Sequence, residues 1–259
     1  MKNKVALVTG GFRGIGKAIC EVLAANGYDL FVHGSHSSSE GEAWLNKLSI
    51  NHNIKVASGF ADFHIQESID TLFQAFSNFS SRLDLLVNNA GYENCYATED
   101  MPISDWNGVL QVNLTAPFQC SQYAARIMKK EGKGGCILNI TSIHDTVPRK
   151  GYTHYCCAKA GLNMLTKNTA IEWAEYNIRV INIAAGAIET DINRAVLDSI
   201  GRDKFNEWIP LGRVGNTDDI SEVILFLASD KAQYITGTTI YIDGGYMQNS
   251  IRYDDRTGK

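Results

Sequence analysis

Apolar residues gather along this chain in short runs that alternate with longer segments of mixed polarity. The runs at 83–88 and 135–140 are mostly apolar over their length rather than alternating with polar positions. Such continuity is typical of strands that are buried on both faces of a parallel sheet. We therefore predict seven strands, at residues 5–9, 29–33, 54–58, 83–88, 135–140, 178–184 and 238–242.

The segments between these runs carry apolar residues at helical spacing. Ile15, Ile19 and Leu23 fall on one stripe within residues 15–26, as expected of a helix that packs one face on a core. The same spacing predicts further helices at 66–79, at 103–131 with a break near Pro117, at 153–177 and at 217–229.

This order of strands and helices is typical of an α/β fold with right-handed crossovers. We expect a doubly wound, Rossmann-type parallel sheet of about seven strands in a three-layer αβα arrangement. No linker or repeat divides the chain, so we expect one domain over residues 1–259. The segment 190–212 has no strand beside it until 238, and we predict that it covers the active site.

The charge and the cysteines limit the partners. Twenty-four basic and 28 acidic residues leave a net charge of −4, whereas nucleic acids and anionic membranes attract basic surfaces. No apolar run is long enough for a membrane span, and no signal-peptide pattern precedes the first strand. The six cysteines form no CxxC pair. We expect a cytoplasmic protein with reduced thiols and no metal, acting on a small molecule.

A glycine-rich turn follows the first predicted strand. Its spacing, G-x-x-x-G-x-G, is set by Gly10, Gly14 and Gly16, with Arg13 and Ile15 between them. Glycines let the backbone approach a pyrophosphate, and the helix that follows offers free N–H groups to the phosphates. The turn therefore predicts a dinucleotide site, although a glycine turn chosen only for its geometry would look the same.

The end of the second strand bears on the choice of nicotinamide cofactor. An acid there would bind the ribose 2′-hydroxyl of NAD and repel the 2′-phosphate of NADP. Residues 33–36 contain no acid, and Arg13, Ser35 and His36 are suited to a 2′-phosphate. We predict a preference for NADP(H) with NAD(H) still possible; a solvated loop is the alternative for Ser35 and His36.

Tyr155 and Lys159 are four residues apart in a predicted helix, so both side chains lie on one face. An ordinary tyrosine has a pKa near about 10, and a neighbouring ammonium ion favours the phenolate. Tyr155 is therefore the predicted acid/base, and Ser142 could hold the substrate oxygen. The cofactor would supply the hydride.

The ordered set of motifs resembles the short-chain dehydrogenase/reductase family over residues 4 to about 247. The resemblance rests on residues 9–16, on the sequence Asn-Asn-Ala-Gly at 88–91, and on Ser142 thirteen residues before Tyr155. It implies a catalytic tetrad of Asn113, Ser142, Tyr155 and Lys159, and it also implies a homotetramer. The cofactor contacts that it implies, besides the glycine turn, Tyr155 and Lys159, are Asp62, Asn89, Ala90, Gly91, Gly186, Ile188 and Thr190.

Within the family, two enzyme classes compete for the substrate. Residues 92–94, 104–107, 142–144, 186–188 and 209–212 resemble bacterial glucose 1-dehydrogenase, whereas the general pattern equally resembles 3-oxoacyl-[acyl-carrier-protein] reductase. An acidic carrier protein would favour a basic patch, for which the available cations are Lys129, Lys130, Lys133, Arg149 and Lys150.

We predict a reaction that interconverts a secondary alcohol or sugar hydroxyl with a carbonyl, on a small sugar or polyol. Its hydroxyls would meet a pocket lined by Glu93, Asn94, His144 and Asn193. Ala185 stands where the family has proline, and we expect this replacement to loosen the strand end that holds the nicotinamide. A non-catalytic, cofactor-binding regulator is the remote alternative, and the presence of both Tyr155 and Lys159 disfavours it.

Overall fold

The computed structural model describes residues 3–249, apart from the side chains of residues 192, 193, 195 and 196. Its centre is one parallel sheet of seven strands in the order β3-β2-β1-β4-β5-β6-β7, which confirms the predicted doubly wound fold. The strands are β1 Val5–Val8, β2 Asp29–Gly34, β3 Val56–Phe60, β4 Leu85–Asn88, β5 Gly135–Ser142, β6 Ile178–Ala185 and β7 Thr239–Ile242.

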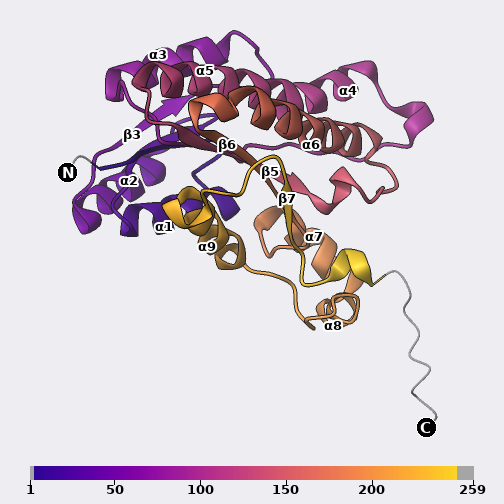
Figure 1. Cartoon of the computed structure of the whole chain (residues 1–259). Coiled ribbons are helices and arrows are strands. Elements are labelled where there is room, and N and C mark those ends of the chain that lie inside the picture. Colours follow the sequence, from indigo (N-terminus) through magenta and orange to yellow (C-terminus); the bar gives the residue numbers. More distant parts are fainter. Residues whose placement is uncertain (1–2, 250–259) are drawn as a thin grey trace.

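Helices cover both faces of this sheet (Figure 1). One layer holds α1 (Gly14–Ala25), α2 (Ser39–His52) and α9 (Thr217–Ala228), and the other holds α3 (Ser68–Phe79), α4 (Ile103–Leu110), α5 (Ala116–Glu131) and α6 (Thr153–Trp173). Each layer has its own apolar core against the sheet, with Leu23 and Ile224 in the first and Phe76 and Met128 in the second. The two cores explain why the central strands are apolar on both faces.

Three helical segments differ from the sequence prediction. The helix α2 was not predicted, because only Leu45 and Leu48 are buried on it and two apolar positions do not form a recognisable helical stripe. The predicted helix 103–131 is interrupted by a π-helical turn, Gln111–Thr115, just before Pro117. Proline has no N–H, so it cannot continue the regular hydrogen-bond ladder of the helix.

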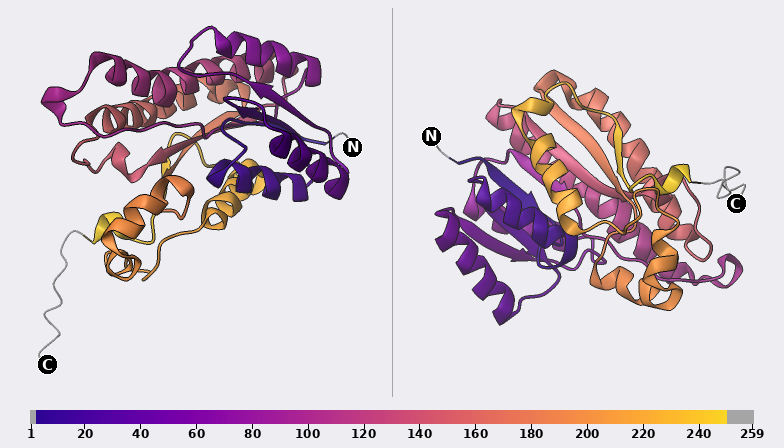
Figure 2. Two further views of the ribbon diagram at one scale, coloured as in Figure 1. Left: turned by 180° about the vertical axis from the view of Figure 1, so that it is seen from behind. Right: turned by 90° about the horizontal axis from the view of Figure 1, so that it is seen from below.

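The third difference is the predicted covering segment 190–212, which contains two helices, α7 (Asp191–Ile200) and α8 (Arg202–Asn206). They lie at the carboxyl edge of the sheet, close to the C-terminal turn Tyr246–Gln248 (left view of Figure 2). Leu197, Phe205 and Ile209 form a small core of their own, against which Tyr246 packs. The segment 190–212 is therefore a small folded helical unit with its own apolar core, located at the carboxyl ends of the strands.

The strand order reverses at β1, which lies between β2 and β4. The carboxyl ends of β1, β4, β5 and β6 therefore open a crevice, the usual ligand position in a doubly wound sheet. No helix among residues 3–249 is long and apolar enough to cross a membrane, and a cytoplasmic location stays a prediction.

Candidate active site

A cavity of about 1110 Å³ occupies the crevice at the carboxyl edge of the sheet. One end is walled by the turn after β1 and by the ends of β2 and β3, and the other end by α8 and the C-terminal turn. Every predicted cofactor residue lines it: Gly10, Arg13, Gly14, Ile15, Gly16, Ser35, His36, Asp62, Asn89, Ala90, Gly91, Tyr155, Lys159, Gly186, Ile188 and Thr190.

The glycine turn leaves no space for side chains at two positions. A Cβ on Gly16 would lie 2.2 Å from the carbonyl oxygen of Gly10, and Gly10 itself has a positive φ of 64°. The amide of Asn89 donates to the carbonyls of Thr9 and Gly10 at 2.9 and 3.0 Å. Asn89 therefore fixes the shape of the turn, and α1 begins at Gly14 with its free N–H groups toward the cavity.

His33, at the end of β2, supports the same turn and was not identified from the sequence. Its Nδ1 accepts from the N–H of Gly10 at 3.3 Å, and its Nε2 lies 2.9 Å from the carbonyl oxygen of Ala61. The ring stacks on Phe63 at a centroid distance of 4.1 Å. Burial lowers the pKa of His33 to about 4, so the imidazole is neutral and can accept from Gly10.

The end of the cavity beside β2, where the 2′ group of the cofactor ribose is expected and which we call the 2′ end, is lined by exposed polar residues. Arg13, Ser35 and His36 are exposed and line the cavity, and Ser35 hydrogen-bonds His36 at 3.0 Å. Phe12 explains why Gly34 precedes them, since a Cβ on Gly34 would lie 2.8 Å from the Phe12 ring. Any side chain at residue 34 would therefore require the Phe12 ring to move.

Asp62, for which the family resemblance implies an adenine contact, lies just beyond the end of β3. Its Oδ1 accepts from the backbone N–H of His64, and it also lies 3.0 Å from Nδ1 of the same residue. These bonds lower the pKa of Asp62. The ring of His64 meets Tyr92 edge-on at 5.2 Å, which closes this wall of the cavity.

The four predicted catalytic residues come together at the middle of the cavity. Ser142 ends β5, Tyr155 and Lys159 lie on α6, and Asn113 lies in the π-helical turn. The ammonium of Lys159 donates to the carbonyl of Ile140 at 3.0 Å and lies 5.4 Å from the centre of the Tyr155 ring.

Asn113 is fully buried and holds the segment after β4. Its Nδ2 donates to the carbonyls of Tyr92 at 2.6 Å and Val109 at 3.0 Å. A Cβ on Gly91 would lie 3.1 Å from Oδ1 of Asn113 and 4.0 Å from the Lys159 ammonium. Gly91 thus leaves a cradle beside Lys159 that a nicotinamide ribose fits.

The electrostatics of the pair are dominated by burial. Burial and the charge of Glu93 raise the pKa of Tyr155, while the Ser142 hydroxyl, which hydrogen-bonds the phenol, lowers it. Lys159 is 4% exposed. Burial lowers the pKa of Lys159 to about 8, against the opposing effect of the carboxylates of Glu93 and Asp145. The phenol is therefore a proton donor at neutral pH, next to a lysine close to its own titration.

Ala185, which replaces the family proline, ends β6. It pairs with Ser142 on one side and with Ile242 on the other. The N–H of the next residue, Gly186, donates to the carbonyl of Ile242 at 2.9 Å, so the strand end is held by sheet pairing. A Cβ on Gly186 would lie 2.6 Å from Cα of Asp243.

Only part of the predicted substrate set meets at the cavity. Glu93 and His144 line it, and Glu93 pairs with Arg149 at 3.2 Å. Asn94 does not: its Nδ2 donates to Tyr92 and to Asp105, and its Oδ1 lies 2.6 Å from Nε2 of His154. The placement of Asn94 in the pocket was therefore wrong, because these neighbours turn its amide away.

Asn193 lies on α7, and its side chain is outside the described residues. An apolar wall that was not predicted from the sequence lines the same cavity as Glu93 and His144. It consists of Ile200, Phe205, Trp208 and Met247. Nothing in the polar pattern of 190–212 identified this wall, since its members are scattered singly over α7, α8, the turn after α8 and the C-terminal turn. Among the described residues, no group of three or more His, Cys, Asp or Glu is placed to hold a metal ion.

Comparison with known proteins identifies the family. Residues 10–247 match the family model described as enoyl-(acyl carrier protein) reductase. The chain is 38% identical to the 3-oxoacyl-[acyl-carrier-protein] reductase FabG of Aquifex aeolicus over 245 residues, which is 95% of this chain and 98% of the relative. It is 35% identical to the 3beta-hydroxysteroid dehydrogenase 1 of Eggerthella lenta over 246 residues, 95% of this chain and 94% of the relative.

Among solved structures, the acetoin dehydrogenase YohF of Salmonella typhimurium superposes with a TM-score of 0.86 at 35% identity, over 97% of this chain and 99% of that one. The names of these relatives cover thioesters, a steroid and a small hydroxyketone, so they agree on the chemistry and differ in substrate. The chain therefore belongs to the short-chain dehydrogenase/reductase family, whose members are NAD(P)-dependent oxidoreductases that interconvert hydroxyl and carbonyl groups.

Proposed function

We propose that this enzyme uses NADP(H) to interconvert a hydroxyl and a carbonyl on a small polyhydroxylated substrate, such as a sugar or polyol. The observation that carries the proposal is the Glu93–Arg149 ion pair in the cavity wall, near Tyr155. A carboxylate and a guanidinium side by side offer acceptors and donors to neighbouring hydroxyls. Both side chains are half-buried, so they favour a substrate whose hydroxyls can add hydrogen bonds to the pair over one that offers none.

In this proposal Tyr155 exchanges the proton of the substrate oxygen, and Ser142 orients that oxygen through a hydrogen bond. Lys159 stabilises the phenolate that forms when Tyr155 gives up its proton. Asn113 holds the turn that faces Lys159. When bound, the nicotinamide gives or accepts the hydride. A supporting feature is that Ser142 and Tyr155 already interact across β5 and α6.

The preference for NADP(H) is supported by the open 2′ end of the site. Arg13, Ser35 and His36 line it, and Ser38, whose hydroxyl caps α2, lines it too. These groups offer donors to a phosphate. None of these four residues is an acid, which would bind the 2′-hydroxyl of NAD(H) and repel the 2′-phosphate of NADP(H). The site therefore binds NAD(H) more weakly in this proposal.

The second candidate function, 3-oxoacyl-[acyl-carrier-protein] reductase, is favoured by the sequence relatives. Within one chain, however, the basic residues do not form one patch. Lys129 and Lys130 lie in the last turn of α5, and Lys133 follows just before the amino end of β5. Arg149 and Lys150 line the cavity at the opposite edge of the sheet, where Arg149 is engaged by Glu93. This separation supports the small substrate.

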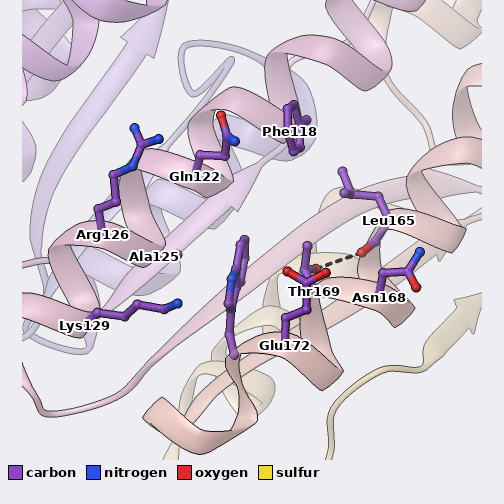
Figure 3. A pocket seen from close by; sticks show the side chains of 10 residues that line it. Phe118, Gln122, Ala125, Arg126, Lys129, Leu165, Asn168, Thr169 and Glu172 are labelled. Atoms are coloured by element: carbon purple, nitrogen blue, oxygen red, sulfur yellow. Dashed lines mark hydrogen bonds between the residues drawn. The ribbon is translucent and has the colours of Figure 1, made fainter.

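We also propose a homotetramer in which the groove between α5 and α6 receives the same helices of a second copy. Phe118 and Leu165 lie on opposite sides of the groove in Figure 3, and Trp173 also lines it. Phe118 and Met164 are exposed large apolar side chains on these helices. Light scattering that gives a monomer mass at every dilution would refute this assembly.

A screen that follows NADPH absorbance tests the function. It compares aldoses and polyols, small hydroxyketones and short ketoacyl thioesters at matched concentrations, in both directions where the chemistry allows. We expect turnover of a polyhydroxylated compound with NADP(H) above NAD(H). Exclusive reduction of the thioesters would replace the proposal with the reductase. The segment 190–212, whose Ile200, Phe205 and Trp208 line the cavity, is proposed to close over whichever substrate binds.

A further inference from the structure

A chain of side-chain hydrogen bonds crosses the sheet beneath α6, outside the cavity. Asn88, Asn139 and Asn182 stand at one level of three neighbouring strands, because each pairs with the next in the register of β4, β5 and β6. Thr239 of β7 continues the row beside Asn182. All three asparagines are buried, so a line of polar groups runs through the core.

The links of this chain all point in one direction. The steps from donor to acceptor are Asn88 to Asn139 (2.8 Å), Asn139 to Thr166 (2.8 Å), Thr166 to Asn182 (2.6 Å), Asn182 to Thr239 (3.4 Å), Thr239 to Asn163 (3.3 Å) and Asn163 to Asp145 (3.2 Å). Thr166 and Asn163 belong to α6 and alternate with the strand residues, so the chain joins that helix to β4, β5, β6 and β7.

The charged end sets this direction. A carboxylate can only accept hydrogen bonds, so Asp145 requires Asn163 to present its NH₂ group. The oxygen of Asn163 is then left to accept from Thr239, and the same rule passes back along the chain. At the far end the Oδ1 of Asn88 has no partner among the described residues, as expected where a chain begins on a donor. Aligned bonds of this kind polarise and strengthen one another.

Asp145 is buried and is satisfied by neutral donors alone. Besides Asn163, it accepts from the hydroxyls of Thr141, Thr146 and Tyr241 at 3.0 to 3.3 Å. No Lys, Arg or His forms an ion pair with it in the described part of the chain. Its turn follows Ser142 directly, and Asn163 lies one helical turn after Lys159.

We propose that Asp145 is a positioning residue for Tyr155 and Lys159, because it ties α6, which carries both residues, to the turn after Ser142 through Asn163 and the row of hydrogen bonds. The idea rests on the acid/base roles proposed above. Tyr155 lies beside Lys159 on the same helix, and the two charges that act on Lys159 are those of Glu93, from the segment after β4, and Asp145, from the turn after β5. Asp145 is the one of the two carboxylates that the cavity does not reach.

The electrostatics agree with this geometry. The Asp145 charge raises the pKa of Lys159 and opposes the effect of burial. Burial lowers the pKa of His144, on the same turn, and the Asp145 charge opposes this effect; burial raises the pKa of Tyr241, on β7, and the Asp145 charge adds to that effect. Loss of the charge should therefore make Lys159 release its proton at a lower pH.

The test is Asp145→Asn, which keeps the volume and removes the charge that orients the chain. In carbonyl reduction, the alkaline limb of kcat against pH should move down by about half a unit or more, and kcat at neutral pH should fall about fivefold. Tyr241→Phe is the matched control, because it removes one donor to the same carboxylate and leaves the charge; its limb should stay in place. An unmoved limb in folded Asp145→Asn overturns the proposal.

A second readout needs neither cofactor nor turnover. Lysine labelled with ¹³C at Cε reports the charge of Lys159 by NMR, and Lys159→Met assigns the signal. Its titration midpoint should fall in Asp145→Asn and stay at the wild-type value in Tyr241→Phe. A shifted midpoint together with an active Tyr155→Phe would show that the charge inference holds while the proposed acid/base role fails.

If Asp145→Asn does not fold, the variant Asn163→Leu tests the positioning role instead. This change cuts the chain from its carboxylate at a partly buried residue outside the cavity. We expect kcat to fall about threefold or more, with cofactor affinity unchanged in a fluorescence titration and the alkaline limb in place. A folded Asn163→Leu with wild-type kcat overturns the positioning role.

Discussion

The two ends of the cavity are built differently. At the cofactor end, strand ends and a glycine turn provide backbone groups, and the side chains that support them, such as Asn89 and His33, bond the backbone of the turn. At the substrate end, the walls are side chains from loops, from α8 and from the C-terminal turn. Backbone geometry recurs whenever the same strand–turn–helix forms, whereas a wall of side chains changes with each substitution. The difference shows why the family shares its cofactor chemistry and varies in substrate.

Tyr155 stands where the two ends meet, and its loss should have the largest effect. Tyr155→Phe removes the transferable proton and keeps the ring, so we expect kcat to fall about 10³-fold in either direction. The cofactor dissociation constant, measured by NADPH fluorescence, should change less than about threefold. Lys159→Met is the contrast, because it should weaken both turnover and cofactor binding. An active Tyr155→Phe would remove the residue from the mechanism.

A change at His33 tests the cofactor end separately from the proposed catalytic residues, because His33 supports the glycine turn. Its folded pKa of about 4 lies below the ordinary 6.5, so the folded state binds fewer protons than the unfolded state between these values. The stability that this group contributes is complete above pH 6.5 and is lost as the pH falls toward 4. The loss should be about 3 kcal/mol.

Denaturant unfolding of wild-type protein and His33→Gln at several pH values measures this contribution. Glutamine does not titrate, so the free energy of unfolding of the variant should fall less steeply between pH 6.5 and 4. The variant should also bind NADPH more weakly at neutral pH, since the N–H of Gly10 loses its acceptor. Parallel pH curves for the two proteins would show that His33 is not buried as a neutral ring.

The same contrast explains how far the sequence predicts this molecule. Apolar runs predicted all seven strands, and burial on both faces is the reason for β1, β2, β4, β5 and β6. The edge strands β3 and β7 are only partly buried. Glycine spacing predicted the turn, because two of its positions leave no space for a side chain. Pattern alone missed α2, whose exposed surface leaves only Leu45 and Leu48 buried, and it missed α7 and α8.

The substrate end was predicted less well, because contacts there depend on neighbours that are distant in sequence. Glu93 was expected to meet hydroxyls directly, and nothing near it in the chain indicated its partner Arg149. Asn94 was expected in the same pocket, but it is held by Asp105 and His154. Residue type predicts what a side chain can bond, while only the fold shows which way it points.

Cofactor choice can be shifted at the 2′ end. Ser35→Asp places a carboxylate beside Arg13 and His36, where the proposed 2′-phosphate would lie, so NADPH affinity should fall about tenfold while NADH affinity holds or improves. Gly34→Asp is unsuitable for this test, because its Cβ would meet the Phe12 ring. Ser39→Asp carries the same added charge outside the cavity wall and serves as the control. Equal losses for both cofactors in Ser35→Asp would contradict the NADP(H) preference.

Two adjacent residues sharpen the comparison at the substrate end. Glu93 lines the cavity, whereas the amide of Asn94 is engaged behind it. Glu93→Gln removes the partner of Arg149 and an acceptor for hydroxyls, so the KM of a polyhydroxylated substrate should rise about fivefold while NADPH affinity stays constant. Asn94→Ala removes the hydrogen bonds of Asn94 to Nε2 of His154 and Oδ1 of Asp105, and should lower the melting temperature with KM changed less than about twofold. The pair separates substrate contact from support: a KM that responds to Asn94 and not to Glu93 would place the hydroxyl-binding wall on the other side of the segment after β4.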